Sequence, residues 1–273
     1  LVPLITEERT LRHLAQTFCT NRNHHALGNS DLKLINDNLE HFEEARKTNK
    51  PQSAATKFGT DFHCFYLEPE EFKKKYILTP PDIKPGSSKA WKEYKEDMER
   101  KGLEILDPED LVAFGIMKGK IDQLKLFRDG IAEKPLFGKI RAADTDIDVK
   151  CRPDYLTKEM IIDLKTAQSA RKEEFDKSVR NYRYYVQAAL YLEICRQHNP
   201  LVDKFIFVVV ESSSPYSVAA YELDAGYLDA GKAQYMADLA KYVYDTRMNR
   251  KGYEPGVSML VPPDWFMKQH FAK

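Results

Sequence analysis

The feature that most constrains the fold is a run of six apolar residues, Phe205 to Val210, in the stretch KFIFVVVE at residues 204–211. Side chains of a strand alternate between its two faces, so a strand of this composition carries apolar side chains on both. Such strands are typical of sheets that are covered on both faces. We therefore expect a sheet with helices packed against it.

Four further stretches read as strands, because apolar residues in them are bounded by turn-like residues. They are LFGKIRA at 136–142, DIDVKCRPD at 146–154, MIIDLKT at 160–166 and SVAAYELD at 217–224. Helical spacing predicts helices at 30–48, 58–76 (interrupted or ended at Pro69), 90–101, 108–130, 170–194 and 225–249. We expect one α/β (α+β) domain over residues 1–273: a mixed central β-sheet flanked by helices, with a helical N-terminal segment (about 1–130) before the sheet core (about 131–273).

Composition excludes several classes of protein. Lys and Arg balance Asp and Glu at 42 each, so the chain is not coated in basic charge, although a local basic groove remains possible. The four cysteines are scattered without a CxxC pair, which speaks against disulfides, structural zinc and an iron–sulfur cluster. No apolar run approaches a membrane span, and the start lacks the layout of a signal peptide. We expect no membrane partner and a cytoplasmic location.

Two charges stand inside the apolar stretch MIIDLKT. Alternation places Asp163 and Lys165 on one face of the strand, beside Ile161, with Ile162 and Leu164 on the other. Lone charges at the end of a buried strand are costly. Two interpretations follow: an ion pair at a strand end, or the metal site of a phosphodiesterase.

A second acidic residue favours the metal site. Residues 147–154 and 160–166 are joined by few residues and are expected to form a hairpin, which would bring Asp154 close to Asp163. Two carboxylates at so short a distance repel each other unless a proton or a cation lies between them. Mg²⁺ suits such hard oxygen ligands, and Mn²⁺ could substitute. Lys165 could then stabilise a metal-bound hydroxide or the transition state, and Leu164 could offer its backbone carbonyl.

These residues resemble the PD-(D/E)XK nuclease motif: Asp154 is followed, nine residues on, by Asp163-Leu164-Lys165. The later stretch QAALY, with Gln187 and Tyr191, is similar to the Q-x-x-x-Y element of RecB-type nucleases. Residues at i and i+4 share one helical face, so these two could meet phosphate or orient the lysine. Each of these short motifs is weak evidence alone. Their occurrence in the expected order of strand, turn, strand and helix makes the resemblance stronger.

The resemblance extends to the exonuclease VIII (RecE) family and runs from about Asn29 to Phe266. FGTDFHCFYLEPEEF at 58–72 looks like that family's G-x-x-x-H-x-x-x-L-E-P-x-x-F segment, and NSDLKLI, IAEKPLFGKI and SMLVPPDWF are similar to other parts of it. By this resemblance the metal ligands are His63, Asp154, Asp163 and the Leu164 carbonyl, Lys165 is catalytic, and Glu133 completes the site.

Several of these residues have plainer alternatives. Glu133 could cap a strand or pair with Lys134, and Gln187 could be a satisfied polar group on a half-buried helix. Arg152 could meet a phosphate or form a salt bridge within the hairpin, and Tyr191 could lie in the core. Three tyrosines precede Gln187 (Tyr182, Tyr184 and Tyr185); bases stack on aromatic rings, but packing against the sheet is the expected use.

The family resemblance implies a Mg²⁺-dependent exodeoxyribonuclease that acts on ends of linear double-stranded DNA. Digestion would run 5′→3′ and leave 3′ single strands for a RecT-like annealing protein. The resemblance also implies a homo-oligomeric ring, with a tetramer favoured, whose channel could be lined by Lys73, Lys74, Lys75, Lys84, Lys89 and Lys92. The alternatives are another PD-(D/E)XK nuclease, RecB-like or restriction-type, or a DNA-binding module of this fold without activity.

Overall fold

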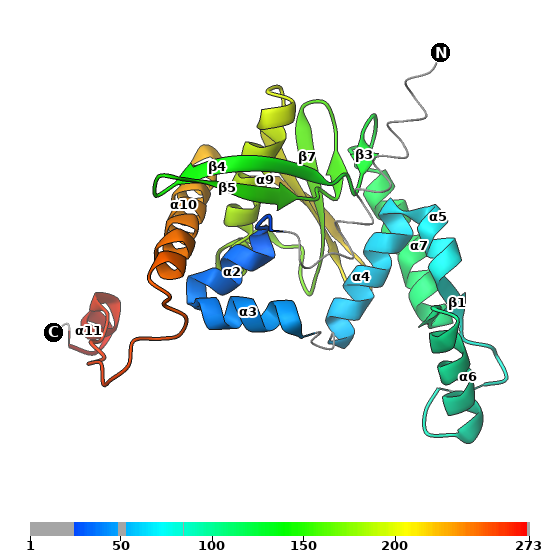
Figure 1. The fold of residues 1–273 in the computed structure, drawn as a ribbon. Helices are drawn as coiled ribbons and strands as arrows, with labels where there is room; N and C mark the ends of the chain where they lie inside the picture. The colour runs from blue at the N-terminus through cyan, green and yellow to red at the C-terminus, as the bar shows by residue number, and fades with distance from the viewer. Residues whose placement is uncertain (1–24, 49–52, 84, 272–273) are drawn as a thin grey trace, which may run out of the picture.

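The computed structural model describes residues 25–48, 53–83 and 85–271 of the 273-residue chain. Its centre is a five-stranded sheet in the order β3-β6-β7-β8-β9 (Figure 1). The strands are β3 (Ile131–Ala132), β6 (Tyr155–Leu156), β7 (Met160–Ala167), β8 (Lys204–Glu211) and β9 (Val218–Glu222). Only β7 and β8 pair in parallel, and the other neighbours are antiparallel. The predicted mixed α/β sheet is confirmed.

Helices cover both faces of this sheet, as the apolar strand β8 predicts. On one face lie α8 (Lys172–Asn181), α9 (Tyr184–His198) and α10 (Ala225–Arg247), with α2 (Asn29–Asp37) and α3 (Leu39–Lys47) beside α10. Their core includes Ile161 of β7, together with Phe205 and Phe207 of β8. A hairpin of β4 (Leu136–Ala142) and β5 (Thr145–Cys151) closes this core across α9 (Figure 1).

The opposite face is covered by α4 (Ala54–Leu67) and α7 (Pro108–Asp122). Phe62 and Phe114 pack there against Ile162 and Leu164 of β7 and Val208 and Val210 of β8. Beyond these helices lie α5 (Pro69–Lys75), α6 (Lys89–Arg100) and the small parallel pair β1 (Tyr76–Leu78) and β2 (Glu104–Leu106). The two cores explain why residues 205–210 are apolar without interruption.

The predicted hairpin between residues 147–154 and 160–166 is wrong. The strand β5 ends at Cys151 and pairs with β4 through a two-residue turn, Ala143–Asp144, in which both residues have positive φ. The short β6 is the partner of β7. Pro153, which has no N–H to donate, follows β5 and separates it from β6.

The single helix predicted for residues 170–194 is also wrong, because α8 and α9 are separated by a turn at Tyr182 and Arg183. Arg183 adopts the left-handed conformation, with φ 60° and ψ 37°, and so cannot continue a right-handed helix. Other predicted helices are shorter or divided. The helix expected at 30–48 is broken at Asn38, whose side chain caps α3, and α7 ends at Asp122 rather than near residue 130.

The C-terminal segment lies apart from the body. α11 (Asp264–Phe271) follows an extended stretch and stands away from the other helices at the lower left of Figure 1. Within the described ranges, no helix has both the length and the apolar character needed to cross a membrane.

Candidate active site

The two charges of β7 face α9 and are bound there by one residue. Asp163 is 0% exposed, and its Oδ2 lies 2.6 Å from Lys165 Nζ. Gln187 of α9 donates from Nε2 to Asp163 Oδ1 at 2.5 Å, while its Oε1 accepts from Lys165 Nζ at 3.3 Å. The amide therefore contacts the carboxylate and the ammonium at once, and a role for Gln187 in orienting the lysine stays a prediction.

Asp154 reaches the same strand from the segment before β6. Its Oδ2 accepts a hydrogen bond from the backbone N–H of Leu164 at 2.8 Å. The expected proximity of Asp154 to Asp163 thus arises from this loop rather than from a β5–β7 hairpin. Leu164 contributes its N–H here, and metal binding through its carbonyl stays a prediction.

His63 and Glu133 approach Asp154 from two other elements. His63 Nδ1, on α4, lies 3.6 Å from Asp154 Oδ2. The backbone N–H of Glu133 donates to the Asp154 carbonyl at 3.0 Å, and Glu133 has a φ of 52°, which is unfavourable for a residue with a side chain. A strained residue in such a position is often retained for its function.

A close helix–strand contact brings His63 to the sheet. At Gly59, one turn before His63 on α4, an added Cβ would lie 2.7 Å from Thr166 Oγ1 of β7. That separation is too short for two non-bonded atoms, so a larger residue would require a new rotamer at Thr166 or a shift of α4 away from β7. Glycine at this position therefore lets His63 reach the end of β7.

The resulting cluster has the composition of a divalent-metal site. One ligand atom from each of His63, Glu133 and Asp154 lies within 4.8 Å of the other two. Glu133 Oε2 and Asp163 Oδ2 are buried without a hydrogen bond: they lie near Arg152 Nε (2.7 Å) and Lys165 Nζ (2.6 Å), but neither contact has hydrogen-bond geometry. Each of these oxygens is paired with one cationic side chain and has a lone pair left over, and carboxylate oxygens are the ligands that a hard cation such as Mg²⁺ or Mn²⁺ prefers. The residues fit such an ion.

The electrostatics of the cluster reflect burial of like charges. Burial, reinforced by Asp154, raises the pKa of Glu133 to about 8 even though Arg152 acts in the opposite direction. Burial also raises the pKa of Asp163 to about 6 and lowers that of His63 to about 4. The pKa of Lys165 is raised because Asp163 and Asp154 together outweigh its burial. The lysine is thus held as a cation, and His63 as a neutral imidazole able to bind metal.

Arg152 and Tyr191, which the sequence placed among DNA-binding residues, have other contacts. Arg152 pairs with Glu133 rather than across a hairpin, and Glu133 does not pair with Lys134 in the described residues. Tyr191 is half-buried against Phe205. Burial raises the pKa of its hydroxyl well above the usual value, and a hydrogen bond with the backbone of Arg152 acts in the opposite direction. DNA binding by Arg152, Gln187 and Tyr191 stays a prediction.

Tyr184, for which packing against the sheet was the expected use and base stacking the alternative, is also a neighbour of the site. Its ring centre lies 4.8 Å from Lys165 Nζ, within cation–π range, and it also packs against Phe207 of β8. The signal was its position three residues before Gln187, which places both side chains on one face of α9.

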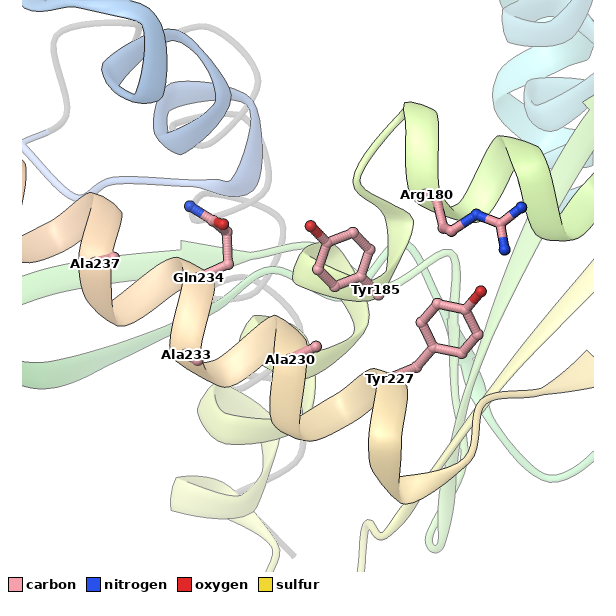
Figure 2. Close-up of a pocket in the computed structure, with 7 residues that line it drawn as sticks. All are labelled: Arg180, Tyr185, Tyr227, Ala230, Ala233, Gln234 and Ala237. Atoms are coloured by element: carbon pink, nitrogen blue, oxygen red, sulfur yellow. The ribbon is translucent and has the colours of Figure 1, made fainter. Parts of the chain in front are cut away.

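Two hollows of the described surface lie elsewhere. One, of about 600 Å³, is lined by Arg180, Tyr185, Tyr227 and Gln234 together with three alanines of α10 (Figure 2). Another, of about 630 Å³, lies between α4 and α6. Neither includes any of the predicted site residues. The candidate site is instead the cluster at β7.

The sequence matches one family model, described as a PDDEXK-like domain of unknown function, over residues 28–254. The chain belongs to this family. The match contains all of the predicted site residues, and it confirms the PD-(D/E)XK fold that the Asp154 to Lys165 spacing indicated. No sequence among the curated proteins is significantly similar to this PDDEXK-like chain.

One solved structure shares the fold of this chain. A presumed exonuclease from Eubacterium rectale aligns with a TM-score of 0.61 and 14% identity, covering 93% of this chain and 97% of that one. A phage-related exonuclease from Haemophilus somnus aligns with a TM-score of 0.33 and 12% identity, covering 84% and 98%. At these identities the first likeness shows the fold alone, and the second is too distant to support an argument.

Proposed function

We propose that this PDDEXK-like domain is a divalent-metal-dependent nuclease that hydrolyses phosphodiester bonds at the ends of linear double-stranded DNA. The observation that carries the proposal is the convergence of His63, Glu133 and Asp154 within 4.8 Å, beside a buried Asp163–Lys165 pair held by Gln187. A purely structural Asp163–Lys165 ion pair would not need three further ligands to converge beside it.

In this proposal each residue has a distinct task. Asp154 and Asp163, with His63 and the Leu164 carbonyl, hold the cation, and Glu133 completes the site. A bound divalent cation would act as a Lewis acid toward water and the scissile phosphate. Lys165 places a positive charge where the pentacovalent transition state gathers negative charge. Gln187 fixes the lysine's direction before substrate arrives, which lowers the reorganisation required during the reaction.

The choice of an exonuclease rests on resemblance to the exonuclease VIII family and on the exonuclease description of the Eubacterium rectale structure. From the resemblance we further propose 5′→3′ digestion that leaves a 3′ single strand for a RecT-like annealing protein. The same resemblance suggests a homo-oligomeric ring, most simply a tetramer.

The lysines proposed for the channel of that ring have local partners in several cases. Lys73 and Lys74 pair with Glu70 and Glu71 on α5, and Lys89 pairs with Glu93 on α6. Lys84 lies outside the described residues. Exposed pairs of this kind are weak, so they could open to contact phosphate.

The test is digestion of linear, nicked and closed circular duplex DNA labelled at either end, with Mg²⁺, with Mn²⁺ and with EDTA. We expect degradation of the linear form only, label released from the 5′ end first, and no activity in EDTA. Cleavage of the closed circle would favour a restriction-type endonuclease. Absence of cleavage with either metal, in protein that binds DNA, would favour the module without activity.

A further inference from the structure

The turn between α8 and α9 is unusual in both backbone and side chain. Arg183 is left-handed there, a conformation that costs a residue with a side chain of the order of 1 kcal/mol or more. Its guanidinium forms an ion pair with Asp238 of α10, which is 2% exposed. Gln234 Nε2 donates to the same carboxylate at 3.1 Å. The turn is therefore fixed to α10 through a buried charge pair.

This fixed turn also touches the candidate site. The Arg183 carbonyl accepts hydrogen bonds from the N–H groups of Val186, at 3.1 Å, and Gln187, at 3.3 Å. Gln187 is the residue that holds Asp163 and Lys165. The conformation that ends α8 thus also sets where α9 begins, and with it the face that α9 presents to β7.

The residues on either side of Arg183 form a row of aromatic rings that leads outward from Lys165. Tyr184 lies 4.8 Å from Lys165 Nζ and packs on Phe207 and Phe175. The Tyr182 ring centre lies 5.6 Å from that of Tyr184, with an angle of 34° between the rings, and Tyr182 is 55% exposed. The row passes from the buried lysine to solvent.

A cation stands at the outer end of this row. Lys33 Nζ, on α2, lies 6.0 Å from the centre of the Tyr182 ring. Lys33 is exposed, and it forms no ion pair with any residue that the structure describes. A single exposed tyrosine would need no explanation. Two adjacent rings between the Lys165 ammonium and an unpaired lysine form a pattern that suits a nucleic acid strand, because aromatic faces stack with bases while lysines meet phosphates.

We infer that Tyr182 and Tyr184 form a stacking site for a nucleobase of the strand being cut, with Lys33 bound to a neighbouring phosphate. The inference rests on the proposed function and adds to it the base-binding side of the site. Tyr184, half-buried between Phe207 and Lys165, supports the platform, and the exposed Tyr182 offers the face on which the base lies. Every base has an aromatic face, so such a site tolerates any sequence, as a nuclease that degrades DNA from its ends requires.

The first test is a double-mutant cycle between protein and substrate. Tyr182→Leu keeps an apolar side chain but removes the ring, and is compared with wild type on linear duplexes that are intact or carry one abasic nucleotide near the end. We expect KM on intact DNA to rise roughly 5- to 150-fold, the range for losing one stacked base, with little change in kcat. On DNA whose abasic position lies opposite Tyr182 and Tyr184, wild type and variant should have equal KM.

Matched variants separate stacking from other roles. Tyr182→Phe and Tyr182→Trp should keep the wild-type KM, because each retains a ring. Tyr244→Leu, at a tyrosine of α10 with a similar exposure of 53%, should have no effect. An equal KM penalty on intact and abasic DNA, or failure of Phe and Trp to restore KM, would overturn the stacking site.

A second measurement needs binding but no cleavage. Wild-type protein is irradiated with DNA that carries 5-iodouracil at successive positions near the end, and the cross-linked peptide is identified by mass spectrometry. A cross-link at Tyr182 in protein that cuts no DNA would remove the proposed function and leave the stacking site standing. DNA cleavage with cross-links only outside residues 182–184 would overturn the stacking site and leave the proposed function standing.

The role of Lys33 is read from salt dependence. Lys33→Gln should reduce the slope of log affinity against log salt by about one unit or slightly less, as expected for losing one phosphate contact. Lys204→Gln, at the opposite end of the parallel β7–β8 pair from Lys165, should leave the slope unchanged. An unchanged slope in Lys33→Gln would exclude the phosphate contact.

Discussion

Lys165 and Asp163 are within contact distance, yet their expected tasks are different. Asp163 is fully buried and is bound by Gln187, whereas the Lys165 ammonium also faces the Tyr184 ring. In the proposed function the acid holds a cation and the lysine meets a phosphate. Their separation into a binding role and a transition-state role can be measured.

Lys165→Ala should reduce turnover by two or more orders of magnitude, because it removes a preorganised charge that acts on the transition state. DNA affinity should change little, since one ammonium among the phosphate contacts contributes only a small part of binding. Single-turnover rates and equilibrium binding, measured on the same duplex, separate the two effects. Near-normal turnover in Lys165→Ala would rule out this role.

Glu133 makes the stability of the metal-free protein depend on pH. Its pKa is raised from an ordinary 4.5 to about 8 in the folded protein, so between these values the folded state holds a proton that the unfolded state has lost. Stability from this group therefore falls as pH rises through that window. Between pH 6.5 and 8 the pH lies above the folded-state pKa values of Asp163 (about 6) and His63 (about 4). Of these three residues, Glu133 therefore contributes most to the change of stability with pH in this range.

We expect urea denaturation in EDTA to show wild type losing roughly 1–2 kcal/mol between pH 6.5 and 8, from about 1.4 kcal/mol per pKa unit. Glu133→Gln, which cannot titrate, should lose much less, while Glu159→Gln at an exposed position should behave as wild type. Parallel slopes in wild type and Glu133→Gln would show that the carboxyl is ionised throughout this range.

At the scale of elements, alternation and composition predicted what depends on local sequence. The apolar run 205–210 predicted a strand covered on both faces, and MIIDLKT predicted the shared face of Asp163 and Lys165. Which strands pair and where a helix is interrupted depend on residues that are distant in the sequence. Residues 147–151 pair with β4 instead of β7, and Arg183, at which α8 and α9 are separated, is ion-paired with Asp238, 55 residues away. Periodicity carries no information about such long-range partners.

The approach of α4 to β7 can be tested through Gly59. Gly59→Ala adds a Cβ that would lie 2.7 Å from Thr166 Oγ1, so either Thr166 changes its rotamer or α4 moves away and carries His63 with it; we expect the second. Alanine favours a helix interior over glycine by up to about 1 kcal/mol, so stability should change little while metal affinity falls. Calorimetric titration with Mn²⁺ measures the affinity. Thr166→Ala in the same chain should restore it, and failure of that rescue would show that the contact does not position His63.

At the scale of the whole molecule, both faces of the sheet contribute to one site. His63 comes from the α4 face, Gln187 and Tyr184 come from the α9 face, and Asp154 and Glu133 come from the segments beside β6 and β3. β7 carries the acid and lysine between the two layers. On the proposed function we expect substrate to approach this cluster from the solvent-exposed side on which Tyr182 lies.

An exonuclease that degrades long tracts must remain on its substrate, yet this chain has no net charge to provide strong non-specific affinity. A closed ring retains DNA by topology, and cyclic assembly of one chain is a common way to build it. The C-terminal segment offers a means of contact, because it stands away from the body (Figure 1). Its exposed apolar residues are Val257, Met259, Leu260, Val261 and Trp265. Contiguous apolar surface of this kind is typical of protein–protein contacts.

We expect light scattering at micromolar concentration to show an oligomer, most simply a tetramer. Replacing Leu260 and Trp265 with Glu should shift it toward monomer and convert long, processive digestion into short tracts, because charges oppose burial of this surface. Val112→Glu, at an exposed apolar position of α7, is the matched control and should leave both properties unchanged. A wild-type monomer that digests kilobase DNA processively would exclude the ring, whereas a monomer with short, distributive digestion would favour a RecB-like relative.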